Sequence, residues 1–143
     1  MRVGAVEFAV LGLLFTASAG AAEVQISEAW IRALPPPAPS GGYFILRNTG
    51  KADITLTGAK SSACGMLMLH LSKETGGMSS MEDVASVPVP AGGEIRFAPG
   101  GYHLMCMDPA PSIKPGASVP VTLLFSDKTE ATANFAVKNA QGK

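Results

Sequence analysis

The stretch Met66-Leu67-Met68-Leu69-His70-Leu71 alternates leucine with methionine or histidine at every position. A period of two residues is that of a β-strand, because successive side chains point to opposite faces of a sheet. A later segment, Tyr102-His103-Leu104-Met105-Cys106-Met107, alternates in the same way. Each segment therefore predicts a strand with one core-facing side and one side that carries methionine and histidine.

Short apolar runs separated by turn residues continue through the rest of the chain. The eleven prolines and sixteen glycines are spread among them, and no run beyond the N-terminal segment has a helical apolar period. Val24, Ile26 and Trp30 are expected on one face of the first strand, and the proline-rich segment 34–42 is expected to be a surface loop. Further strands are predicted at Tyr43–Arg47, Ile54–Leu56, Ile95–Phe97, Val119–Phe125 and Ala131–Val137. The pattern predicts an all-β domain, either a two-sheet sandwich or a small Greek-key barrel.

The N-terminal segment has the features of an export signal. Arg2 gives a thin basic start, residues 10–15 form a short apolar core, and Ala19-Gly20-Ala21 matches a cleavage site for small residues. The apolar run is too short to span a bilayer. We therefore predict a signal peptide at residues 1–21, one domain at 22–138 and a disordered polar tail at 139–143.

Charge excludes several classes of partner. The chain has 11 basic and 11 acidic residues, a formal net charge of zero. Nucleic-acid binding favours a basic face, and an anionic membrane surface attracts clustered lysine and arginine. We therefore expect no nucleic-acid partner and no stable membrane insertion. A monomer is also expected, although charge does not bear on it.

Potential soft metal ligands are concentrated in one window. Six of the seven methionines and both histidines lie between Cys64 and Met107, and the window contains the spacing His70-x10-Met81-x21-His103-x-Met105. Thioether and imidazole groups together favour Cu(I), whereas zinc favours cysteine, histidine and carboxylate, and calcium favours oxygen. The alternative is that each histidine is a solvated side chain and each methionine fills the core.

The remaining sulfur atoms have several interpretations. Free, buried thiols are favoured for Cys64 and Cys106, because strand parity places them on different faces; a Cys64–Cys106 disulfide and copper ligation are alternatives. Among the extra methionines, Met78 is the favoured auxiliary ligand because it lies three residues before Met81. The other three, Met66, Met68 and Met107, are interpreted as incidental.

The four-residue spacing resembles the signature of the periplasmic copper chaperones of the PCuAC type. The similarity runs from about Val24 to Val137 and includes segments 29–33, 42–50 and 99–105. It implies a cupredoxin-like β-sandwich without enzymatic activity that binds one Cu(I) through His70, Met81, His103 and Met105. It also implies delivery of copper in the periplasm to an acceptor domain, such as the binuclear copper centre of cytochrome c oxidase or another copper chaperone.

Two other functions remain open. An electron-transfer cupredoxin needs a cysteine thiolate with two histidines, but no histidine closely follows Cys106. An exported interaction module without metal would explain the fold but not the methionine cluster. A hydrolase is disfavoured because neither histidine accompanies a recognisable nucleophile motif.

Overall fold

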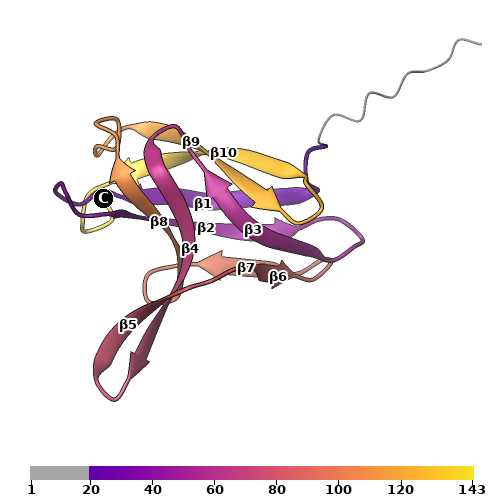
Figure 1. Cartoon of the computed structure of the whole chain (residues 1–143). Coiled ribbons are helices and arrows are strands. Elements are labelled where there is room, and N and C mark those ends of the chain that lie inside the picture. The colour runs from indigo at the N-terminus through magenta and orange to yellow at the C-terminus, as the bar shows by residue number, and fades with distance from the viewer. Residues whose placement is uncertain (1–19) are drawn as a thin grey trace, which may run out of the picture.

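The computed structural model describes residues 20–143, and the predicted signal peptide lies almost wholly outside this range. The described residues form ten β-strands and contain no helix, which confirms the all-β prediction (Figure 1). Consequently, this part of the chain has no helix long and apolar enough to cross a membrane. In chain order the strands are β1 (Val24–Arg32), β2 (Ser40–Asn48), β3 (Ile54–Lys60), β4 (Cys64–Thr75), β5 (Met78–Asp83), β6 (Val87–Val89), β7 (Glu94–Phe97), β8 (Tyr102–Pro109), β9 (Ser118–Phe125) and β10 (Glu130–Lys138).

The strands form one continuous, curled sheet in the order β5-β4-β8-β2-β1-β10-β9-β3-β6. Strand β7 lies off this path and pairs with β2, which also pairs with β8 through Ser40–Gly42. The curl brings β3 into contact with β4, although they lie near opposite ends of the order. The sheet therefore encloses a core between two layers, as expected for a sandwich.

Apolar side chains from nearly every strand fill the space between the layers. Phe44 stacks on Phe97 with ring centroids 4.4 Å apart, and Phe135 meets Phe44 edge to face at 5.8 Å. Leu69 and Leu104 belong to the same buried cluster, so the leucine side of β4 and β8 faces the core as predicted. Burial of this apolar surface is the main term that stabilises the fold.

One predicted boundary and one predicted face differ from the observed strands. Segment 34–42 is a loop only as far as Pro39, because Ser40–Gly42 form the start of β2 and pair with β8. Trp30 was expected on the same face as Ile26, but the pairing of β1 with β2 shifts between Ser27 and Trp30. Glu28 in this bulge has a φ of 49°, so the two-residue alternation breaks. Ile31 enters the core instead, and Trp30 packs on Tyr43 on the other side.

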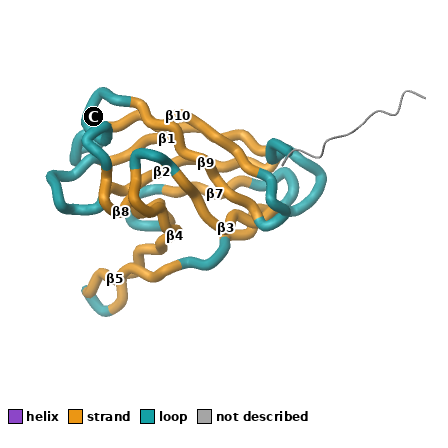
Figure 2. The backbone as a smooth tube through the Cα atoms, turned by 45° about the horizontal axis from the view of Figure 1, so that its top comes forward, coloured by secondary structure: helices purple, strands orange, loops and turns teal. Residues whose placement is uncertain are grey.

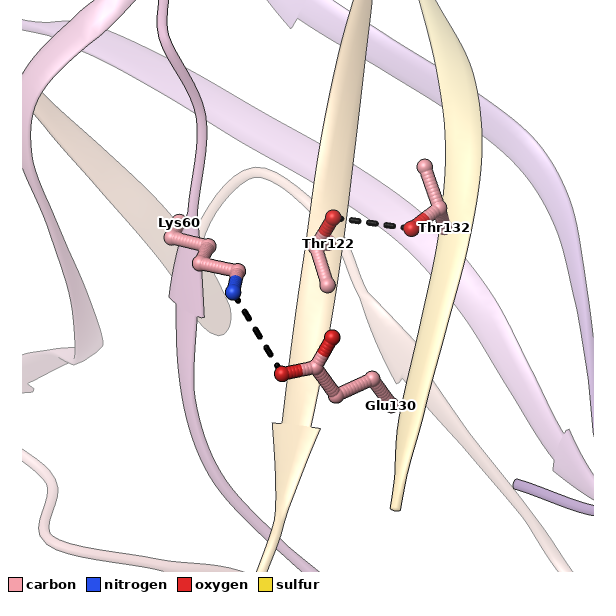
Figure 3. Close-up of polar contacts among 4 residues, drawn as sticks. All are labelled: Lys60, Thr122, Glu130 and Thr132. Atoms are coloured by element: carbon pink, nitrogen blue, oxygen red, sulfur yellow. Dashed lines mark hydrogen bonds and ion pairs between the residues drawn. The ribbon is translucent and has the colours of Figure 1, made fainter. Parts of the chain in front are cut away.

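Polar pairs cover the outer face of β3, β9 and β10. Lys60 Nζ lies 3.3 Å from Glu130 Oε1, and the hydroxyls of Thr122 and Thr132 are 2.8 Å apart across the strands (Figure 3). Both side chains of the ion pair are largely exposed, so the pair contributes little stability. This face presents ordinary solvated strand surface.

The β4–β5 hairpin projects away from the body of the sheet (Figures 1 and 2). Its two-residue turn consists of Gly76 and Gly77, with φ angles of 60° and 79°. Positive φ at both positions suits a tight hairpin turn and favours glycine. The turn returns β5 antiparallel to β4 and places Met81 opposite Ser72.

Cys64 and Cys106 form a disulfide, so the favoured prediction of free thiols is wrong. The parity argument assumed regular extended backbone at this end of β4 and β8. Asp108 instead has a φ of 50°, so β8 departs from extended backbone next to Gly65. The Cα atoms of the two cysteines are consequently 5.4 Å apart, within the range for a disulfide.

Candidate metal centre

Adjacent strands β4 and β8 place the two histidines side by side. His70 pairs directly with His103 in the antiparallel register, and Met68 pairs directly with Met105. These four side chains share the face opposite Leu69 and Leu104, which lie in the core. The ring centroids of the two histidines are 5.6 Å apart.

The hairpin adds Met81 to this face. Met81, His103 and Met105 line one pocket of about 260 Å³, together with residues from β1, β2 and the loop before β8. Three of the four residues in the predicted set therefore border a common space. His70 does not border this pocket but contacts the ring of His103 from the neighbouring strand.

His103 is oriented by the backbone. Its Nδ1 lies 3.2 Å from the carbonyl oxygen of Gly101. A carbonyl only accepts hydrogen bonds, so this contact assigns the proton of a neutral imidazole to Nδ1. Nε2 then carries a lone pair, and this atom is buried without a hydrogen-bond partner. Such an orphaned acceptor in a pocket with two thioethers is available to a metal ion.

Burial favours the uncharged form of His103. Only 4% of the residue is exposed, and this desolvation lowers its pKa below the ordinary value of 6.5. The Gly101 carbonyl raises the pKa and the neighbouring His70 lowers it, but burial has the largest effect. The resulting neutral imidazole is the form that ligates metals.

His70 has a polar neighbour at one nitrogen. Its Nε2 lies 2.9 Å from Oδ1 of Asp83 on β5, without the alignment of a hydrogen bond. The Asp83 side chain is 78% exposed, whereas that of His70 is 14% exposed. His70 Nδ1 is buried without a partner. A metal could therefore bind at Nδ1, or at Nε2 once Asp83 turns into solvent.

The predicted face is correct for both histidines, but the predicted exposure is not. His103 was expected to face outward, opposite the core, but it is buried because the hairpin and the loop before β8 cover this end of the face. Met81 on the hairpin is 60% exposed. The site is thus a covered histidine pair with one accessible thioether at its edge.

The sequence did not single out the cationic wall of the pocket. Arg32 lines it, and its guanidinium lies 5.3 Å from the centre of the Trp30 ring and 5.5 Å from that of Tyr43. Both distances suit cation–π contacts, which hold the charge in place. Only the placement of Trp30 and Arg32 two residues apart, on one face of a strand, could have indicated it.

The available donors argue against a hard-metal site. Among residues 20–143, no three histidine, cysteine, aspartate or glutamate side chains gather in a way that could hold a metal ion. The groups that converge here are imidazole nitrogens and thioether sulfurs, which favour soft ions.

Comparison with known proteins shows the family. The family described as "Putative lipoprotein LpqE-like" matches residues 24–137. The chain belongs to the LpqE-like family. A relative from Leifsonia xyli, "Putative lipoprotein Lxx21020", is 35% identical over 83% of this chain and 72% of its own length. Uncharacterized protein RP573 of Rickettsia prowazekii is 30% identical over 70% of this chain and 56% of its own length.

Solved structures confirm the PCuAC-type resemblance and the fold of this LpqE-like protein. The copper-bound PCuAC domain from PmoF2 has a TM-score of 0.67 and 24% identity, covering 84% of this chain and 96% of that domain. The Cu(I) form of DR1885 from Deinococcus radiodurans has a TM-score of 0.62 and 27% identity, covering 82% and 78% of the two chains. The cupredoxin-like β-sandwich expected from the sequence is thereby confirmed.

Proposed function

We propose that this protein is a Cu(I)-binding chaperone, with His70, Met81, His103 and Met105 as the metal ligands. The observation that carries the proposal is the buried, unpartnered Nε2 of His103 in a pocket shared with Met81 and Met105. The structural similarity to copper-bound PCuAC domains supports the choice of metal.

Charge explains why Cu(I) fits better than a divalent ion. Two neutral imidazoles and two thioethers contribute no negative charge, so the loaded site keeps the charge of the ion. A charge of +1 is less costly to hold in a partly buried pocket than +2. The Arg32 guanidinium on the same wall adds a further reason to avoid a higher charge.

Unequal exposure of the ligands suggests a route for transfer. Met81 is largely exposed on the projecting hairpin, whereas His103 is buried. We infer that an acceptor's ligand first displaces Met81 and that the histidines release copper last. The predicted acceptor is a periplasmic copper domain, with the binuclear centre of cytochrome c oxidase as the leading candidate and another copper chaperone as the alternative.

Location and domain limits belong to the same proposal. The family description as a lipoprotein supports export, and we propose the periplasm as the compartment. We further propose cleavage near residue 21 and a copper-binding domain at 22–138, followed by the tail 139–143. The role is that of a monomeric carrier and not of an enzyme.

The disulfide weakens the electron-transfer alternative. A blue-copper site needs a cysteine thiolate, and both cysteines of the chain are paired with each other. The metal-free interaction module remains the alternative function, and copper titration separates it from the chaperone.

The test is an anaerobic Cu(I) titration against a competing chelator. We expect one tight equivalent in the wild type and at least a tenfold weaker affinity in His103→Ala and in Met105→Leu. Met78→Leu is the matched control, because this thioether is 76% exposed at the hairpin tip opposite Thr75. Equal affinities in the wild type and both ligand variants would contradict the ligand assignment, and no binding at all would support the interaction module.

A further inference from the structure

The methionines of β4 and β8 form an ordered ladder that extends beyond the proposed centre. Three successive pairs on one face are directly opposite in register: His70 with His103, Met68 with Met105, and Met66 with Met107. We call the last pair the outer rung and the histidine pair the inner rung. Neighbouring rungs are about 6–7 Å apart, so the outer rung lies about 13 Å from the inner one.

The same two strands distinguish leucine from methionine by face. In β4 the core-facing positions 67, 69 and 71 are all leucine, while the opposite positions 66 and 68 are methionine. Both side chains are apolar and of similar volume, and they replace one another at little cost in a core. What differs is the thioether sulfur, which can ligate a soft metal. If these positions served only as apolar surface, there would be no physical reason to place leucine on one face and methionine on the other.

Exposure increases along the ladder from the inner to the outer rung. His103 is buried, Met68 and Met105 are intermediate, and Met66 and Met107 are 57% and 36% exposed. Large apolar side chains paired at the surface call for an explanation by function. Directly opposite strand residues have Cβ atoms about 4.5–5.5 Å apart, so the flexible methionines of the outer rung can turn their sulfurs toward one ion. Met68, on the next rung about 6–7 Å away, can reach the same ion.

We propose that Met66 and Met107, together with Met68, form a second Cu(I) site at the open end of the ladder. The site consists only of neutral thioethers and is more exposed than the histidine centre, so it is the weaker of the two. Met68 of this outer site pairs directly with Met105 of the proposed centre, so copper has a continuous series of sulfur ligands toward His70 and His103. The direction of transfer rests on the proposed copper function. The outer site itself does not depend on the histidine centre.

The register favours Met66, Met68 and Met107 over Met78 as auxiliary ligands. Met78 is opposite Thr75 at the tip of the hairpin, one strand further from β8 than the ladder. Met66, Met68 and Met107 were interpreted as incidental, because sequence distance from Met81 was the only available criterion. Cross-strand pairing now places these three in one continuous surface with Met105.

Silver titration of the apo protein tests the proposal. Ag(I) is a soft monovalent ion that needs no reductant, so the disulfide stays intact during the measurement. The methyl carbons of methionine, labelled with ¹³C and followed by NMR, report each thioether separately. We expect a first equivalent to shift Met81 and Met105, and a second to shift Met66 and Met107.

Two variants complete the experiment. Met66→Leu/Met107→Leu should bind one equivalent instead of two and keep the first step, while Met78→Leu should keep both steps. Methyl signals of Met66 and Met107 that do not move through two equivalents would overturn the outer site. Shifts at Met66 and Met107 without any at Met81 and Met105 would support the outer site and contradict the proposed centre. The two ideas can therefore fail separately.

Discussion

Removal of the disulfide should destabilise this domain severely. Cys64 and Cys106 are separated by 42 positions, and the loop between them contains all four proposed copper ligands. Cross-linking a loop of this length lowers the entropy of the unfolded chain by an amount equivalent to about 4 kcal/mol at 25 °C. Small domains have total stabilities of about 5–15 kcal/mol. The loss is thus a large fraction of the whole.

The variant Cys64→Ala/Cys106→Ala isolates this effect. Cys106 is fully buried, so the truncation adds a small cavity penalty to the entropic loss. Urea unfolding followed by circular dichroism should give a stability lower by about 3–5 kcal/mol than that of the oxidised wild type. Reductant should destabilise the wild type and leave the variant unchanged. A loss below about 1 kcal/mol would refute the reasoning that this loop is held closed mainly by the disulfide.

Two further predictions concern the hairpin and the buried histidine. In Gly77→Ala the added Cβ meets no heavy atom within 4 Å, but the φ of 79° is unfavourable for alanine. The resulting strain of about 1–2 kcal/mol should reduce hydrogen-exchange protection in β5 and weaken copper binding. Unchanged protection in β5 would contradict this prediction. Burial lowers the pKa of His103, so as the pH falls this imidazole is protonated in the unfolded chain before it is protonated in the folded protein. The stability of the apo protein should therefore fall as the pH drops from about 7.5 to 5. Urea unfolding across this range should show a shallower fall in His103→Gln, and identical slopes would exclude His103 as the cause.

Sequence periodicity predicted the faces of β4 and β8 because both strands are regular where the ligands lie. Its two failures have one physical cause. Glu28 and Asp108 have positive φ angles although neither is glycine, and each interrupts the two-residue alternation. Beyond Glu28 the parity reverses, which moves Trp30 out of the core and Ile31 into it. At Asp108 the bend brings together two cysteines that parity had placed on different faces. Aspartate is enriched in left-handed backbone, but a single aspartate does not locate such a site, and nothing local marks Glu28.

Other features of the site depend on contacts between distant segments. The burial of His103 requires Met81, Pro99 and Leu34 to meet around one pocket, and no spacing in the sequence encodes that meeting. The hydrogen bond from His103 Nδ1 to the Gly101 carbonyl is local and assigns the tautomer, but the burial of the free Nε2 depends on the distant segments. Sequence could therefore name the donors, whereas the structure was needed to show which nitrogen is available and how deep it lies.

The alternation in β4 and β8 couples copper chemistry to core packing. Leu69 and Leu104 are paired in the core directly between the His70–His103 and Met68–Met105 pairs on the other face. A slip of one residue would move leucine to the metal face and histidine into the core, so the apolar packing specifies the register of the ligands. The disulfide at the end of the same two strands restricts such a slip further. The ligand geometry therefore needs no separate scaffold, because the packing that stabilises the core also places the imidazoles and thioethers opposite one another.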